Sequence, residues 1–528
     1  MKNLLKIFTA AAVLLVSVSS CKKDLNLKPT NDITADVAYA TPAGYKQVLA
    51  KIYGSFATTG GGGSGDSDLK GIDAGASDFI RLYWNAQELT TDEGICVWND
   101  PGVYDLNYQT FTSGNIILQG LYTRSLYQIT VINEFLREST PDKLASRNIT
   151  GNDAANITAY RAEARFLRAY QYWVLMDLFG NPPFITEDNQ IGIVAPQQIK
   201  RADLFKYVES ELLAVEAVLP ATNEYGRVTV GADRMLLSRL YLNALVYTGT
   251  AKNTEAITYA SKVINSGNYS LASTYKNLFL ADNNIGNQEA ILSINYDGLY
   301  TQNYGGTTFL VNASINSDMN PTSYGVPNGG WGGIRTRSTL PAIFGISGAF
   351  TSNPDSRAMF FGTKSANDDV AVFTDGLRAI KFRNVTQSGA PGPSNNGTFV
   401  SIDFPLFRLP EAYLNYAEAV LRGGSGGSTG QAVNYVNLLR QRAYGNASGN
   451  VSNLSLDDVL AERAKEFFWE GYRRTDLVRF GKFTDGGYLW PFKGGVKAGR
   501  GVEAYRSIFP LPASDLISNN NLVQNPGY

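Results

Sequence analysis

Apolar residues recur every three or four positions over much of the chain, which is the spacing of an amphipathic α-helix. One such stripe predicts a helix over 118–136, because six apolar residues fall on one helical face: Leu118, Tyr122, Leu126, Ile129, Ile132 and Leu136. Similar stripes predict helices over 204–219 and 237–247, and a short helix over 254–266 that ends at Gly267. The pattern therefore indicates a mostly α-helical chain.

Glycine, proline and capping residues mark the ends of further helices. The segment AYRAEARFLRAYQYWVLMDLFGNPPF is apolar on more than one face, which predicts a buried helix that ends at Gly180 and the two prolines after it. Three later segments also predict helices: PEAYLNYAEAVLRGG, GQAVNYVNLLRQRAYG and SLDDVLAERAKEFFWEGYRR. In the last of these, Ser455 and Asp458 are a predicted N-terminal capping pair.

The order of these elements indicates a scaffold with long loops. Consecutive helices carry alanine at the turns of their faces, a spacing that resembles degenerate tetratricopeptide helix pairs. Between 268 and 408 the helical pattern fails, and Gly, Asn, Ser and Thr accumulate among short strand-like runs such as EAILSINY and IDFPLFRL. We interpret this region as binding loops on a helical scaffold. The stretch 58–71 fits G-x-G-x-x-G, but no apolar strand precedes it, so we interpret it as a loop without a phosphate-binding role.

The N-terminal residues have the features of an export signal over 1–20. Lys2 and Lys6 precede an apolar run of about a dozen residues, which is too short for a bilayer span of about 20. Small residues then precede Cys21, as in a bacterial lipoprotein signal. This predicts acylation of Cys21 by lipids such as palmitate, and a polar tether over 22–40 that leads into a short helix. An ordinary secretory signal with an incidental cysteine is the alternative.

Composition excludes several classes of function. The formal net charge of −1 over 528 residues gives no basic surface for nucleic acid. Histidine is absent, which excludes His-activated nucleophiles and His-ligated zinc or iron. If Cys21 is acylated, Cys96 is the only other cysteine, so neither a disulfide nor a Cys-ligated cluster can form. No cofactor and no metal are predicted.

One tryptophan lies in an unusual setting. The stretch VPNGGWGGI places Trp331 between two pairs of glycines, which supply no side chains to cover its ring. Because the chain itself offers so little cover, we predict that a ligand covers Trp331.

A set of carboxylates raises the possibility of an enzyme. Glu462, Glu466 and Glu470 stand four residues apart and are followed by a group of charged residues: Arg473, Arg474, Asp476 and Arg479. Paired carboxylates can hydrolyse glycosidic bonds. Helical spacing beside arginines is more typical of an ion-pair network that holds the C-terminal helices. We favour the structural role, and a helical glycoside hydrolase using Glu462 and Glu466 stays as the alternative.

Several segments together resemble the SusD/RagB family of outer-membrane nutrient-binding lipoproteins. They run in order from Cys21 to Tyr528: AEARFLRAYQYWVLMDLFGNPPF, LLSRLYLNALVYTG, FPLFRLPEAYLNYAEAV, EFFWEGYRRTDLVRFG and IFPLPASDLISNNNLVQNPGY. Four shorter segments are similar to the family's starch-binding member: DLKGIDAGASDFIR, ELTTDE, NYGGTTFLV and FTDGL. The resemblance implies a single SusD-like helical domain over 21–528, built on four tetratricopeptide-like units, with the ligand site in loops.

The resemblance also implies a function and a site. Family members sit on the cell surface over a SusC-like TonB-dependent transporter, as a lid that captures nutrients for import without catalysis. In the starch-binding member, three aromatic residues form an arc that matches a helical α-glucan. That arc falls on Trp98, Tyr304 and Trp331, and an arginine contact falls on Arg81. Starch or malto-oligosaccharides are therefore the implied ligands.

The chain departs from the starch-binding pattern at two positions. Cys96 stands where that member has a second tryptophan, and Pro101 stands where it has a hydrogen-bonding asparagine. Asn99 and Asp100 are expected to replace part of the lost polar contact. Two alternatives remain among binding proteins: a family member tuned to another glycan or to peptides, and a tetratricopeptide scaffold that binds only protein.

Overall fold

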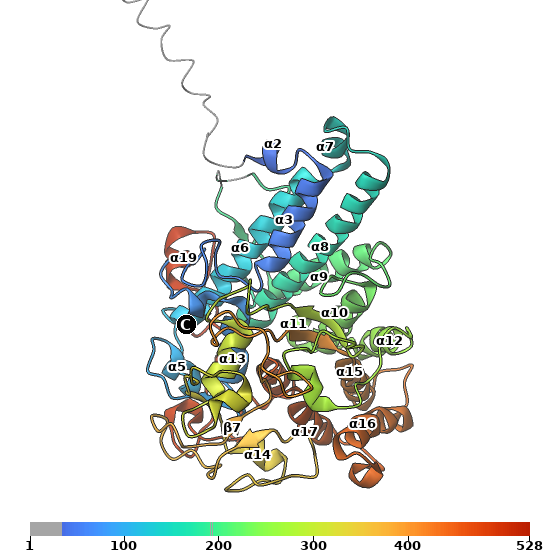
Figure 1. The fold of residues 1–528 in the computed structure, drawn as a ribbon. Coiled ribbons are helices and arrows are strands. Elements are labelled where there is room, and N and C mark those ends of the chain that lie inside the picture. Colours follow the sequence, from blue (N-terminus) through green and yellow to red (C-terminus); the bar gives the residue numbers. More distant parts are fainter. Residues whose placement is uncertain (1–33, 191, 193) are drawn as a thin grey trace, which may run out of the picture.

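The computed structural model describes residues 34–190, 192 and 194–528, and its regular structure is mainly α-helical (Figure 1). The predicted export signal, Cys21 and the first part of the predicted tether lie outside the described residues. Within the described part, none of the helices combines the length and the apolar character needed to cross a bilayer.

Long helices that pack on one another form one end of the molecule, at the top of Figure 1: α3 (Pro42–Gly54), α6 (Ile116–Glu138) and α8 (Gly151–Phe179). Helix α6 confirms the helix predicted from the apolar stripe. It begins where the Asn115 side chain accepts hydrogen bonds from the amides of Ile117 and Leu118, both at 3.1 Å. Helix α8 confirms the predicted buried helix and ends before Gly180, whose φ of +72° does not continue a helix.

The following helices pack successively on one another and confirm the predicted mostly α fold with helix pairs. Helix α8 packs on α9, α9 on α10, α10 on α12, α12 on α15, and α15 on both α16 and α17. Buried alanines on these helices, such as Ala256 and Ala417, allow close approach. The bounds are α9 (Arg201–Glu216), α10 (Val230–Leu242), α12 (Asn253–Ile264), α15 (Leu409–Leu421), α16 (Thr429–Tyr444) and α17 (Leu456–Phe467).

The remaining elements are short. The helices among them are α2 (Ala35–Ala38), α4 (Phe79–Glu88), α5 (Val103–Tyr108), α7 (Pro141–Ser146), α11 (Ala244–Thr248), α13 (Gly306–Ser314), α14 (Thr339–Ile343), α18 (Arg473–Arg479) and α19 (Ala513–Ser518). The described strands form antiparallel pairs: β1 (Gly94–Cys96) with β5 (Ile334–Thr336), β2 (Pro183–Phe184) with β3 (Gln197–Gln198), β4 (Ala290–Ile294) with β8 (Phe404–Arg408), and β6 (Phe360–Phe361) with β7 (Arg378–Ala379).

Two predicted helices are each divided in the structure. The stripe over 237–247 belongs to α10 and α11, which separate at Asn243, where the side-chain amide donates to the Arg239 carbonyl at 2.9 Å.

The capping pair at the start of α17 is confirmed, with reciprocal hydrogen bonds between Ser455 and Asp458. However, α17 ends at Phe467, so placing Glu470 on the same helix as Glu462 and Glu466 was wrong. The backbone turns because Trp469 has a φ of +68°.

The loop-rich region 268–408 contains two short α-helices that the sequence pattern did not predict, α13 and α14. The strand-like runs are confirmed, since they form β4 and β8 and pair with each other. Helix α13 begins at the second of two glycines and is buried on every side, so its polar residues do not gather on a solvent face that would reveal a helical period. In Figure 1 this region surrounds α13, α14 and β7, on the side away from α3 and α8.

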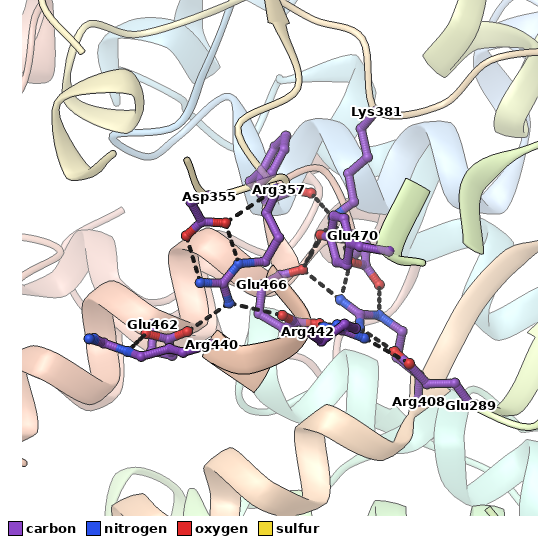
Figure 2. A network of polar contacts seen from close by, with 12 residues as sticks. Glu289, Asp355, Arg357, Lys381, Arg408, Arg440, Arg442, Glu462, Glu466 and Glu470 are labelled. Carbon is purple, nitrogen blue, oxygen red and sulfur yellow. Dashed lines mark hydrogen bonds and ion pairs between the residues drawn. The ribbon is translucent and has the colours of Figure 1, made fainter. Parts of the chain in front are cut away.

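A buried network of charged residues connects the C-terminal helices to this region (Figure 2). Glu466 accepts hydrogen bonds from Arg408 at 2.5 Å, Arg442 at 2.6 Å and Arg357 at 3.1 Å. Further pairs extend the network: Arg357–Glu462, Arg440–Glu462, Arg357–Asp355, Arg408–Glu470, Lys381–Glu470, Arg408–Glu289 and Arg442–Glu289. The predicted structural role of the three glutamates is confirmed by these contacts.

A buried acid directly before β8 makes stability depend on pH. The Asp403 carboxylate accepts the Tyr296 amide at 2.9 Å, and burial raises the pKa of Asp403 from 3.8 to about 6. Between these values the folded chain keeps a proton that the unfolded chain has lost, so stability falls as the pH rises through this window. At about 1.4 kcal/mol per pKa unit, the total is about 3 kcal/mol.

We therefore expect Asp403→Asn to become more stable relative to the wild type by about 2 kcal/mol between pH 4 and pH 7. Urea unfolding of both proteins at pH 4, 5, 6 and 7 measures this difference. A constant offset between the two proteins across this range would contradict the raised pKa.

Candidate functional site

The β1–β5 pair brings two predicted tryptophans to the same end of one ladder. The strands are antiparallel, with Cys96 opposite Ile334, and the ladder continues through a 2.9 Å bond from the Val97 amide to the Gly333 carbonyl. Trp98 therefore lies just beyond the end of β1, and Trp331 lies just before β5. Pairing of two three-residue strands thus brings together the chain segments that carry these two side chains.

A buried carboxylate positions the other two predicted residues. Asp78 caps α4 by accepting the Arg81 amide at 2.9 Å, and the same side chain accepts the Gly306 amide at the start of α13 at 2.8 Å. The Arg81 side chain then donates to the carbonyl of Tyr304 at 3.1 Å. Helix α4, with Arg81, is therefore fixed to the turn that carries Tyr304.

The predicted rings and the arginine form one continuous group. The ring centroids of Tyr304 and Trp331 lie 6.1 Å apart with a 46° angle between their planes. The Arg81 guanidinium lies 5.9 Å from the Trp98 ring centroid and 4.6 Å from that of Phe309, which packs edge-on against Trp98 at 6.0 Å. Tyr304 is 40% exposed, and both tryptophans are partly exposed with the rest of each ring packed on the core. The group is thus a tilted, partly open aromatic surface next to a cation.

The glycines around Trp331 allow the backbone to pack closely against other groups. A methyl group at Gly333, whose φ is +114°, would lie 2.3 Å from the Trp98 ring, and one at Gly330 would lie 2.1 Å from the Ile315 carbonyl oxygen. No larger residue fits either position without movement. Because Gly333 has no side chain, the Trp98 ring packs directly against the backbone just after Trp331.

The two departures from the starch-binding pattern have different environments. Cys96 is buried in β1, where burial raises the pKa of its thiol to about 12, so it neither reaches a surface ligand nor acts as a thiolate at neutral pH. Pro101 is exposed, as are Asn99 and Asp100, on the loop after β1. Burial lowers the pKa of Arg81, and acidic neighbours including Asp100 oppose that shift. Asp100 therefore lies close enough to act on the charge of Arg81, which borders the aromatic group.

Sequence reasoning missed the residues that support this group. Phe309 lies beneath Arg81 and Trp98, and Phe399 packs against Tyr304 with centroids 5.2 Å apart. The N-cap role of Asp78 could have been predicted from the sequence, because aspartate directly before an apolar helical run is typical of an N-cap. The positions of Phe309 and Phe399 could not, since they follow from tertiary packing.

The geometry of the glutamate network argues against a hydrolase. Glu462 and Glu466 are fully buried, and arginines occupy their carboxylate oxygens. Burial alone would raise the pKa of Glu466, but attraction from its arginine partners outweighs it and holds that pKa far below the usual range. A general acid needs a raised pKa and access to substrate, and Glu466 has neither.

A separate cavity of about 1130 Å³ lies between α2, α3, α6 and the loop around 185–197. Its lining includes Val48, Val131 and Ile185, and it contains none of the predicted site residues. Nothing in the structure indicates an occupant for it.

Comparison with known proteins places this arrangement in a family. A model of the SusD family matches residues 351–528. The chain is 35% identical to the starch-binding protein SusD of Bacteroides thetaiotaomicron, over 100% of this chain and 99% of that protein. The fold is similar to that of surface glycan-binding protein A from Bacteroides fluxus, with a TM-score of 0.69, 22% identity, and 92% and 100% of the two chains covered.

Another similar structure is surface glycan-binding protein A from Bacteroides thetaiotaomicron in complex with laminarihexaose. Its TM-score is 0.67 at 21% identity, with 91% of this chain and 98% of that chain covered. The full-length identity to SusD, together with the shared helical architecture, shows that this chain belongs to the SusD family.

Proposed function

We propose that this protein is a non-catalytic, lipid-anchored glycan-binding protein of the outer membrane that captures starch-like α-glucans at the cell surface. The observation that carries the proposal is the tilted aromatic group of Trp98, Tyr304 and Trp331 beside Arg81. The 35% identity to a protein named for starch binding supports an α-glucan as the ligand.

Aromatic rings suit sugar capture for a simple physical reason. One face of a pyranose ring presents C–H groups, which pack on the negative face of an aromatic ring. Burial of that apolar area contributes about 25 cal/mol per Å², while hydroxyls at the sugar's edge stay free for water or for donors such as Arg81. Because the planes of Tyr304 and Trp331 differ by 46°, successive sugars on them would follow a curve, as those of a coiled α-glucan do.

Weak binding fits delivery to a transporter. Three ring contacts, less the cost of association, give a Kd of roughly millimolar to micromolar, or about −4 to −8 kcal/mol. Such a complex releases its ligand readily. We infer that the captured glucan passes to a SusC-like TonB-dependent transporter, and that acylation of Cys21 holds the protein at the outer membrane facing the exterior.

Titration of the purified protein with maltoheptaose and with laminarihexaose tests the ligand class. We expect calorimetry to detect maltoheptaose at millimolar Kd or tighter, and to detect little heat with laminarihexaose. The opposite preference would favour a family member tuned to a different glycan. Binding of neither sugar would favour a peptide ligand or a scaffold that binds only protein.

Incubation with amylopectin tests the enzymatic alternative. Because Glu462 and Glu466 are buried in ion pairs, we expect no increase in reducing ends. A steady increase that Glu462→Gln abolishes, with the fold intact, would replace the binding proposal by a hydrolase.

A further inference from the structure

One phenylalanine is exposed beside the aromatic group. Phe373 is 45% exposed, and it is the most exposed phenylalanine among the described residues. The adjacent Val372 is 40% exposed. Exposed apolar residues are common singly, but a contiguous apolar patch is typical of a binding surface. A phenyl ring has no polar edge that water would stabilise.

The position of Phe373 follows from the glycine pair after Trp331. A methyl group at Gly332 would lie 3.3 Å from Cδ1 of Phe373, and one at Gly333 would lie 2.3 Å from Cε2 of Trp98. Two rings from distant parts of the chain therefore lie against consecutive glycines. Phe373 thus borders the site next to Trp331.

The segment that carries Phe373 is held to β5 by several bonds. Arg335 donates to the carbonyl of Val370 at 2.9 Å and also to that of Val372. The Asn367 side chain donates to the Thr336 carbonyl at 3.1 Å.

Within the segment, the Asp375 carboxylate accepts the amides of Asp368 and Asp369 at 2.9 and 2.8 Å. The same strand that follows Trp331 therefore also fixes the backbone beneath Phe373. A ring that is already in place loses little freedom when a ligand binds.

We propose that Phe373 is a further ring contact for the bound glucan, beside Trp331, and that it determines the preference for longer chains. This proposal rests on the proposed function. A phenyl ring offers an apolar face without a hydrogen-bonding group, so it would stack on a sugar unit at the end of the aromatic group. A short oligosaccharide that fills only Trp98, Tyr304 and Trp331 would not reach it.

Calorimetry with maltoheptaose and maltotriose on Phe373 variants tests this. We expect Phe373→Leu, which keeps apolar volume but removes the flat ring, to weaken maltoheptaose binding about threefold to tenfold. Maltotriose binding should stay within about twofold, because the contact lies beyond its reach. Phe373→Tyr keeps the ring and should match the wild type. Val523→Ala, at an exposed valine whose backbone bonds to Gln198 and to none of the site residues, is the control and should leave both affinities unchanged.

The outcomes separate this proposal from the proposed function. If Phe373→Leu binds maltoheptaose as the wild type does, while Trp331→Ala weakens both sugars, the Phe373 contact is refuted and the site stands. If wild-type protein binds neither sugar, both proposals fail. A crystal structure of the wild type with maltoheptaose decides independently of any variant's folding: a glucose ring within about 4.5 Å of Phe373 supports the contact, and solvent there overturns it.

Discussion

Replacing Trp331 by alanine should weaken maltoheptaose binding about tenfold or more and leave the fold unchanged. Truncation of a central aromatic contact commonly costs 2 kcal/mol or more, which is about thirtyfold in Kd. The backbone at Trp331 is held by its own amide, which donates to the Asn312 carbonyl at 2.7 Å, and the next amide donates to Ile315 at 2.8 Å. Both bonds survive loss of the side chain.

Trp98→Ala should weaken binding to a similar degree, but with some loss of stability, because the Trp98 ring also packs on Phe309 and the backbone at Gly333. Calorimetry measures affinity, and thermal unfolding monitors the fold. Trp331→Phe is the matched control, since it keeps an aromatic face and should retain most of the affinity. Undiminished binding by the Trp98→Ala, Trp331→Ala double variant would refute the assignment of the site.

Neutralising Glu466 should be among the most destabilising single changes in the protein. Its carboxylate contacts Arg408, Arg442 and Arg357, all buried, so Glu466→Gln leaves those guanidinium groups without their shared counter-charge. Removing one partner of a buried ion pair typically costs about 3–5 kcal/mol. We expect a loss of this size in the free energy of unfolding, measured by urea denaturation at neutral pH.

An exposed ion pair provides the comparison for that measurement. Glu503 pairs with Arg506 at 2.9 Å, but its side chain is 63% exposed, so Glu503→Gln should change stability by less than about 1 kcal/mol. Equal effects of the two substitutions would mean that the buried network contributes no more than a surface pair.

The sequence predicted those helices whose apolar stripe faces a core. Helix α6 has such a stripe, and Ser455 with Asp458 marked the start of α17 by their side-chain chemistry. Helix α13 escaped prediction because it is short and buried all round, so its polar residues mark no solvent face. The break after Phe467 escaped because the backbone conformation of Trp469 follows from packing rather than from residue type.

The candidate site was proposed by a different route. Trp331 stood out through its glycines, but nothing local connected it with Trp98, because β1 and β5 are three residues long and show no period. Only the resemblance to a family brought Arg81 and Tyr304 to the same place. Phe373 belonged to a segment noted for that resemblance, yet its exposure and its contact with Gly332 required the folded chain.

The bonds that join Val97 to Gly333 and Arg81 to Tyr304 span more than two hundred residues of chain each. Contacts so distant in sequence form late and only when the intervening helices are in place. On the proposed function, a truncated or stalled molecule would thus lack the glucan-binding surface rather than present a weakened one. Retention on an amylose column would accordingly separate molecules that have finished folding from those that have not.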